Sequence, residues 1–268
     1  MKRFVVVLLT LSFLFCLVQP LFAADTLTCW FPPGWKKKAA QAQTIAKALS
    51  AESGIKVRPR IAKSYPEILT AFSSNKPNLV YVGSFVQAII NARNLGTPLV
   101  QNVNGKEFYS GVLVYPKGGD PAAILKKDAA QIAFAVGASS GESSAKAATS
   151  GAASVGTANH GASCAAVKAG RAKAAVVKNW WWESNSSKYP ELAMYEMPGV
   201  SIKKNPDNVL TASKAVPGSV QNKIQAAAID SSSAFGKGAK MMPFSASKLA
   251  FSLELMQKGK INPKSYTW

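Results

Sequence analysis

The chain alternates short apolar strands with amphipathic helices, and this pattern constrains its fold more than any other feature. In the first unit, strands are expected at residues 27–31, 55–61 and 79–82, each followed by a segment with helical spacing. The clearest helical segment places Ala42, Ile45, Ala46 and Leu49 on one face. Such alternation is typical of a parallel sheet with helices on both faces.

A second unit repeats the alternation further along the chain. Apolar residues 132–136 predict a strand, followed by a serine- and glycine-rich turn at residues 138–142 and an alanine-rich helix. A further small-residue helix is expected at residues 161–170, and a strand at residues 174–177. The chain is therefore predicted to be an α/β protein with two mainly parallel sheets.

Two extended crossings, near residues 108–115 and 208–212, connect these units. They predict two lobes joined by a two-stranded hinge. Lobe 1 is expected to hold residues 24–108 and 209–268, and lobe 2 residues 109–208. Such a fold places a ligand in the cleft between the lobes, and closure over the ligand is a hinge motion.

Asn104-Gly105 lies just before the first crossing, between the apolar segments 99–100 and 112–115. This dipeptide is a strong turn signal because both of its residues tolerate positive φ angles. The sequence therefore predicts that the two apolar segments pair as a β-hairpin.

The N-terminus has the pattern of a secretory signal peptide. Two basic residues precede an apolar run from Phe4 to Val18, and residues 21–23 offer a small residue for cleavage. A membrane anchor is disfavoured because the run is short for a span and is broken at Gln19-Pro20. We therefore expect residues 1–23 to be removed and the mature protein to work in the periplasm.

The mature chain is strongly basic. Removing Lys2 and Arg3 from the formal charge of +19 leaves 19 − 2 = +17. This charge favours anionic partners such as phosphate-like solutes, and export makes nucleic acid the least natural of them, so we expect none. Apart from Lys36-Lys37-Lys38 the basic residues are scattered, and a solvated basic surface accounts for most of them.

The sequence gives little support for catalysis. His160 is the single histidine, metal ligands do not cluster, and no pair of base and nucleophile is evident. Neither a zinc hydrolase nor a serine hydrolase is predicted, and we expect a monomeric binding protein without enzyme activity, metal or cofactor. Cys29 and Cys164 fall in different predicted lobes, so we expect both to be free and buried.

Three strand-to-helix junctions carry glycine or serine where a helix should begin: Pro33-Gly34, Gly83-Ser84 and Ser139-Ser140-Gly141. A helix N-terminus offers unpaired N–H groups and about half a positive charge. Several such termini aimed at one point bind an oxyanion without any arginine. Serine also caps helices that bind nothing, so the prediction depends on the joint placement of these junctions at the carboxyl ends of strands.

Five motifs occur in an order and spacing that match a known family: Tyr65-Pro-Glu-Ile-Leu, residues 78–84, residues 108–112, Val136-Gly-Ala-Ser-Ser-Gly, and Asn159-His160. Over most of its mature length the chain resembles the phosphonate/phosphite/phosphate-binding receptors of bacterial ATP-driven importers. The resemblance implies the type II periplasmic-binding-protein fold, a small oxyanion ligand and an ABC permease of the inner membrane as partner.

The resemblance also implies ligand-binding residues. Tyr65 and Tyr109 match positions whose hydroxyls line the cleft of the family. Ser84 matches a helix start in the first lobe, and Ser139 and Ser140 match the turn of the second lobe that holds the phosphonate.

Three further candidates follow from the resemblance with a structural alternative beside each. His160 matches a histidine that faces the ligand, although it also suits a helix cap. Asp207 falls near an acidic position that meets the amino group in aminophosphonate-binding members, although turn chemistry explains it equally well. Trp180 either walls the cleft, accepting an apolar or cationic substituent, or packs in the core or at a contact between the lobes.

The chain departs from the family where aminophosphonate-binding members place a second carboxylate. After Val177 it has Asn179-Trp180-Trp181-Trp182 instead. A bound ammonium without a charged partner keeps its desolvation cost, so phosphate, phosphite or methylphosphonate is favoured over a zwitterion. We predict a receptor that delivers such an oxyanion to an ABC importer. The alternative is a ligand-sensing protein that docks on a membrane signalling receptor.

Overall fold

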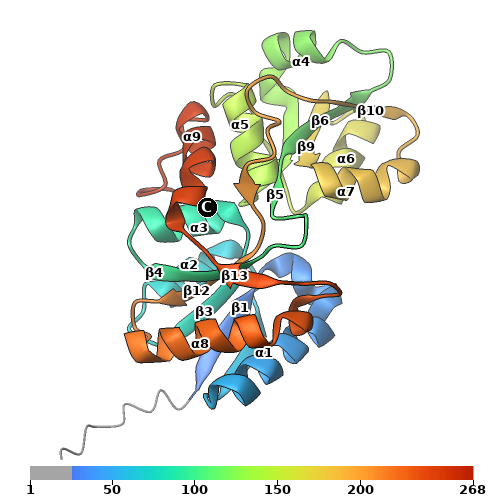
Figure 1. Cartoon of the computed structure of the whole chain (residues 1–268). Helices are drawn as coiled ribbons and strands as arrows, with labels where there is room; N and C mark the ends of the chain where they lie inside the picture. Colours follow the sequence, from blue (N-terminus) through green and yellow to red (C-terminus); the bar gives the residue numbers. More distant parts are fainter. Residues whose placement is uncertain (1–25, 268) are drawn as a thin grey trace, which may run out of the picture.

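The structure is a computed structural model that describes residues 26–267, apart from the side chain of Ser139. The predicted signal peptide, residues 1–23, lies outside the described residues. Two lobes, each built on its own sheet, are stacked along the long axis of the molecule, with the hinge segments between them (Figure 1). The predicted two-lobed α/β fold is confirmed.

The sheet of lobe 1 has six strands in the order β13-β4-β12-β3-β1-β2. β1 pairs in parallel with β2 and β3, while β12 and β13 run antiparallel to their neighbours. β2, which contains Pro59, lies at the edge where a missing N–H donor is tolerated. The strands are β1 (Leu27–Phe31), β2 (Val57–Ile61), β3 (Asn78–Val82), β4 (Gly96–Asn102), β12 (Val209–Ser213) and β13 (Met241–Pro243).

Helices cover both faces of this sheet, as the alternation of strands and helices along the chain predicts. One face carries α1 (Ala39–Ser53) and α8 (Gly218–Asp230), and the other carries α2 (Tyr65–Phe72) and α3 (Ser84–Ala92). Short helices complete the lobe: η1 (Pro33–Lys38), η5 (Ser232–Phe235) and η6 (Ala246–Leu249).

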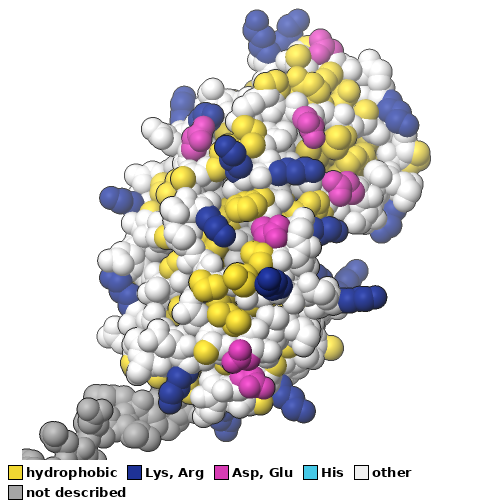
Figure 2. Space-filling model, viewed as in Figure 1, with side chains coloured by type: hydrophobic (Ala, Val, Ile, Leu, Met, Phe, Trp, Pro, Cys, Tyr) yellow, Lys and Arg dark blue, Asp and Glu magenta, His cyan; other side chains and the backbone are white. Residues whose placement is uncertain are grey.

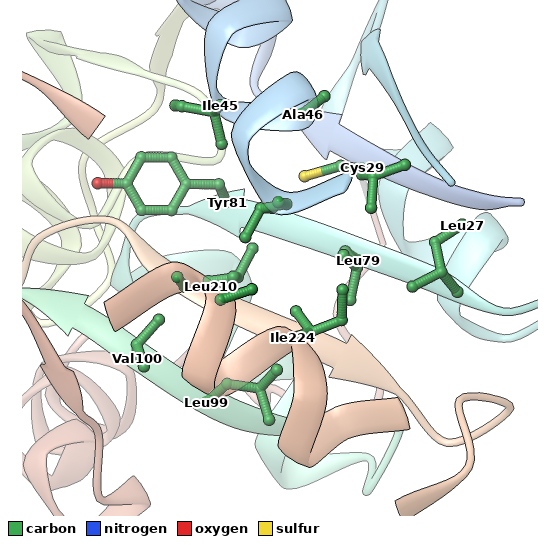
Figure 3. Close-up of a cluster of buried hydrophobic side chains, with 14 of the residues drawn as sticks. Leu27, Cys29, Ile45, Ala46, Leu79, Tyr81, Leu99, Val100, Leu210 and Ile224 are labelled. Carbon is green, nitrogen blue, oxygen red and sulfur yellow. The ribbon is translucent and has the colours of Figure 1, made fainter. Parts of the chain in front are cut away.

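The core of lobe 1 explains why β3 is apolar from Leu79 to Val82. Ile45 of α1 and Ile224 of α8 point towards Leu79 of β3 and Leu210 of β12 (Figure 3). All five residues of β3 are buried, because helices pack on both sides of it.

The sheet of lobe 2 has five strands in the order β10-β6-β9-β7-β8. Its parallel part is β7, β8 and β9, and β6 and β10 join it in antiparallel pairs. The strands are β6 (Gly111–Pro116), β7 (Ile132–Ala135), β8 (Val155–Thr157), β9 (Ala174–Lys178) and β10 (Leu192–Tyr195). The helices are α4 (Pro121–Lys127), η2 (Ala129–Gln131), the π-helical turn η3 (Ser139–Ser143), α5 (Ser144–Ala148), α6 (His160–Lys168), α7 (Asn179–Asn185) and η4 (Ser186–Lys188).

Two short strands form the hinge. β5 (Phe108–Tyr109) pairs antiparallel with β11 (Asn205–Pro206), so the second crossing pairs three residues earlier in the chain than residues 208–212. The predicted hairpin around Asn104-Gly105 is wrong. The chain bends there, with Gly105 at a φ of +85°, but within residues 26–267 β4 pairs only with strands of lobe 1 and β6 only with strands of lobe 2. A local turn signal does not decide which strands pair, because burial of each apolar strand in its own lobe decides that.

The last helix, α9 (Ala250–Lys258), contacts both lobes and lies beside α5 and α3 (Figure 1). Phe251 and Leu255 pack in the core of lobe 2, while Met256 packs with α3 in lobe 1. The division into residues 24–108 with 209–268 and residues 109–208 remains a prediction.

The structure also bears out the expectations for the two cysteines and for the scattered basic side chains. Cys29 on β1 and Cys164 on α6 are both free and buried, in different lobes. Within residues 26–267, no helix combines the length and apolar character needed to span a membrane. On the face shown in Figure 2, lysine and arginine side chains are spread over both lobes.

Candidate functional site

A cavity of about 140 Å³ lies between the lobes and is bordered by the hinge. Drug-sized ligands occupy pockets of roughly 300–1,000 Å³, so this cavity suits a much smaller molecule. Its lining comes from lobe 1, lobe 2 and both hinge segments: Pro32, Tyr65, Val82, Gly83, Phe85, Val86, Tyr109, Gly137, Ala138, Ser140, His160, Lys178, Asp207 and Asn208.

Four helical segments begin at this cavity. α2 follows β2, α3 follows β3, η3 follows β7 and α6 follows β8. Tyr65, Gly83, Ser140 and His160 lie at or next to these starts and line the cavity. The carboxyl ends of parallel strands meet at one edge of a sheet, so both lobes present helix starts to the same space. The partial positive charges of these starts favour an anion there.

Ser84 and Tyr109 form a hydrogen-bonded pair at the border of the cavity. Their hydroxyl oxygens lie 2.7 Å apart, and both side chains are buried. Tyr109 lines the cavity, whereas Ser84 lies behind it and holds its hydroxyl in place. This contact links α3 of lobe 1 to the hinge strand β5.

His160 and Ser140 form the wall contributed by lobe 2. Ser140 Oγ lies 3.3 Å from His160 Nε2, and His160 Nδ1 is buried without a hydrogen-bond partner among the described residues. Burial and, next, the charge of Lys178 lower the pKa of His160 to about 4, so the imidazole is neutral at pH 7. A neutral imidazole has one N–H donor and one acceptor, so the buried Nδ1 still has the capacity for one hydrogen bond.

Lys178 is a lining residue that sequence reasoning missed. Its Nζ lies 2.7 Å from Asp207 Oδ1, and this pair is the charged part of the lining. The two charges cancel, so the side chains that line the cavity are neutral overall. The position of Lys178 at the carboxyl end of β9 was the available signal, but the apolar pattern that predicted this strand ends at Val177.

Glu142 is a second residue that sequence reasoning missed. Its carboxylate is buried in η3 and accepts the N–H of Gly137, which lines the cavity, at 2.8 Å. Lys146 Nζ and Tyr266 Oη lie 2.8 Å and 2.6 Å from its Oε1. The carboxylate of Glu142 thus stabilises the turn η3 through these contacts. The signal was its place as the acidic residue of a turn rich in serine and glycine.

The structure brings most of the candidate residues together. Tyr65, Tyr109, Ser140, His160 and Asp207 line the cavity. Ser84 supports Tyr109. Trp180 is not a lining residue, since its ring lies beyond Tyr109 at 6.1 Å between ring centroids. The side chain of Ser139 lies outside the described part of the structure. The role of each in binding remains a prediction.

A larger cavity of about 500 Å³ shares Tyr65, Ala138 and His160 with the first. Most of its remaining lining is apolar or small, and includes Val136 and Pro33, the first residue of η1. The predicted strand-to-helix junction at Pro33-Gly34 therefore borders this larger cavity and not the smaller one. No group of three or more histidine, cysteine, aspartate or glutamate side chains suited to a metal occurs among residues 26–267.

Two hinged lobes and an anion-favouring cavity between them define a substrate-binding protein. The family described as "ABC transporter, phosphonate, periplasmic substrate-binding protein" matches residues 36–244. The chain belongs to this family, as the motifs predicted, and is therefore a binding protein and not an enzyme. A comparison with curated proteins gave no match.

Solved structures share the fold at low sequence identity. PhnD1 from Prochlorococcus marinus, solved with methylphosphonate, is 14% identical with a TM-score of 0.67 over 88% of this chain and 98% of that one. A binding protein component of an ABC phosphonate transporter from Pseudomonas aeruginosa is 15% identical with a TM-score of 0.69 over 88% and 87%. A Xanthomonas citri protein bound to ATP is 11% identical with a TM-score of 0.68 over 88% and 97%.

Proposed function

We propose that this protein captures a small phosphorus oxyanion, namely a phosphonate, phosphite or phosphate, in the interlobe cavity. The observation that carries the proposal is the meeting of four helix starts at one cavity of about 140 Å³. Their partial charges supply the attraction, since the lining side chains are neutral overall. The imidazole of His160, which lines the cavity, supplies a further polar contact.

The same proposal includes the later steps of transport. The mature protein works as a monomer in the periplasm, closes over the anion by motion at β5 and β11, and delivers it to an ABC permease in the inner membrane. Membership of the family supports this course, because the family consists of periplasmic substrate-binding proteins of such transporters.

Thermal unfolding of the mature protein tests capture. Ligand at 100 times its Kd stabilises by about 2.7 kcal/mol, which raises Tm by roughly 5–10 °C for a chain of this size. Phosphate, phosphite, methylphosphonate and sulfate are compared at millimolar concentration. At least one phosphorus oxyanion should raise Tm more than sulfate, and a panel without any shift would contradict the proposal.

A variant in the cavity separates specific binding from salt effects. Ser140→Ala removes a lining hydroxyl beside His160 and should weaken binding about tenfold or more. Ser187→Ala, an exposed serine of η4, is the matched control and should bind like the wild type. Delivery is tested by uptake: cells that lack the protein should stop importing the labelled anion. The wild-type gene should restore import, and the gene for Ser140→Ala should restore it less.

A further inference from the structure

The ammonium of Lys178 lies in a box that is built to hold a cation. Asp207 Oδ1 lies 2.7 Å from its Nζ. The ring centroids of Tyr109 and Trp180 lie 4.3 Å and 4.6 Å from the same nitrogen. Both rings are within the distance of about 6 Å at which an aromatic face attracts a cation. We call Asp207, Tyr109 and Trp180 the ammonium box.

The walls of the ammonium box are held by contacts that do not involve Lys178. Tyr109 is 4% exposed, its hydroxyl meets Ser84, and its ring packs edge-on against Trp180. The backbone N–H of Asp207 donates to the carbonyl of Glu107 at 2.8 Å on the neighbouring hinge segment. The box is therefore a preformed feature of the hinge and lobe 2, and Lys178 is the group that fills it.

The box opens onto the interlobe cavity, because Tyr109, Asp207 and Lys178 all line that cavity. Ser140 and His160 line the same small space. An oxyanion bound at the helix starts has its substituent within reach of the box, given a cavity of only about 140 Å³. The group that occupies the box therefore influences which substituents of the ligand the cavity can accept.

We propose that Lys178 determines specificity: it fills the ammonium box with the protein's own cation, so that the cavity accepts oxyanions with uncharged substituents and rejects those that carry an ammonium group. A ligand ammonium would meet the like charge of Lys178, and Asp207 is already neutralised by it. This inference rests on the proposed function, and it deepens it by defining the class of ligand.

Two probes that differ in one terminal group test the proposal: ethylphosphonate and 2-aminoethylphosphonate. Calorimetry on the mature wild-type protein should show at least about tenfold tighter binding of ethylphosphonate. Lys178→Ala empties the box while its carboxylate and rings remain. In that variant the affinity for 2-aminoethylphosphonate should rise at least about tenfold relative to the affinity for ethylphosphonate, because the ligand's ammonium takes the place vacated by Lys178.

Two further variants make the test decisive. Lys173→Ala removes an exposed lysine of the same lobe with the same loss of charge, and its preference should equal that of the wild type. Lys178→Met with Asp207→Asn removes both charges without leaving an unpaired carboxylate. This double variant should keep ethylphosphonate binding within a few fold and lose most of the discrimination against the amine.

The outcomes separate this inference from the proposed function. If the wild type binds both probes equally, or if folded Lys178→Ala keeps the preference for ethylphosphonate, the role of Lys178 is wrong while capture of phosphonates stands. If the affinity of the double variant for ethylphosphonate falls by a hundredfold or more, Lys178 is a direct ligand of the oxyanion and the inference is again overturned. If the wild type binds no oxyanion of the panel, both proposals fail together.

Discussion

Tyr266 and Glu142 join the two lobes, as the hydroxyl of Tyr266 donates to Oε1 of Glu142 at 2.6 Å. The ring of Tyr266 packs edge-on against Phe85 of α3 in lobe 1, and its carbonyl accepts from Arg93. Glu142 belongs to η3 in lobe 2, where it also holds the N–H of Gly137 at the cavity. The C-terminal segment is thus tied to the turn that borders the proposed binding site.

The first prediction concerns this contact. Tyr266→Phe keeps the ring on Phe85 but removes a hydrogen bond to a buried carboxylate. We expect the free energy of unfolding to fall by about 1.5–3 kcal/mol, the usual contribution of a hydrogen bond to a charged group. Urea unfolding of the mature protein measures it. Tyr195→Phe is the control, because the Tyr195 hydroxyl has no hydrogen-bond partner among residues 26–267. Equal effects of the two variants would show that the contact adds nothing.

The second prediction concerns the pH dependence of stability. In the unfolded chain His160 takes up a proton near pH 6.5, but in the folded protein its pKa is about 4. Between these values the unfolded state binds more protons, so stability should fall as the pH drops from 6.5 towards 4. The loss due to His160 is at most roughly 3 kcal/mol and is complete below pH 4.

The variant His160→Asn isolates this effect because it removes the titrating group. Urea unfolding at several pH values should give a flatter profile for the variant than for the wild type between pH 4 and 6.5. Parallel profiles would mean that His160 titrates in the folded protein as it does in the unfolded chain.

The third prediction concerns the two thiols. Burial raises the pKa of Cys164 to about 12, and burial raises the pKa of Cys29 as well. Neither side chain is exposed, so a thiol reagent such as Ellman's should not react with the native mature protein. In denaturant without reductant, both thiols should react. Absence of reactive thiols after unfolding would reveal a disulfide and contradict the separation of the cysteines into two lobes.

The fourth prediction concerns the core of lobe 1. Leu79 is fully buried on β3, between α1 and α8 in Figure 3, so Leu79→Ala should lower the free energy of unfolding by about 2–5 kcal/mol. Ile202→Ala, at a side chain that is 39% exposed, should change it by less than about 0.5 kcal/mol. Ligand affinity of the folded protein should remain unchanged in both variants. A weakened affinity in Leu79→Ala would show that the site depends on this core.

Patterns along the chain were enough to predict much of the architecture. The fully apolar residues 79–82 indicated a strand covered on both faces, and β3 is that strand. The position of Pro59 indicated an edge, where β2 lies. Such features are set by the periodicity of burial, which short stretches of sequence carry directly.

Pairing over long distances was outside the reach of such patterns. Asn104-Gly105 has the composition of a hairpin turn, yet β4 and β6 belong to different sheets. The register of β5 with β11 depends on the packing of both lobes, which no local segment encodes.

By itself, the sequence determined which helices begin with glycine or serine at the ends of strands, and it thus predicted an anion-binding edge that includes Ser140. Only the tertiary structure decided what lies opposite them. Lys178 and Asp207 are 29 residues apart in the chain and meet because the hinge brings β11 against β5 beside the end of β9. A charge pair of this kind depends on distances in space, and a linear pattern contains the charges but not the distance between them.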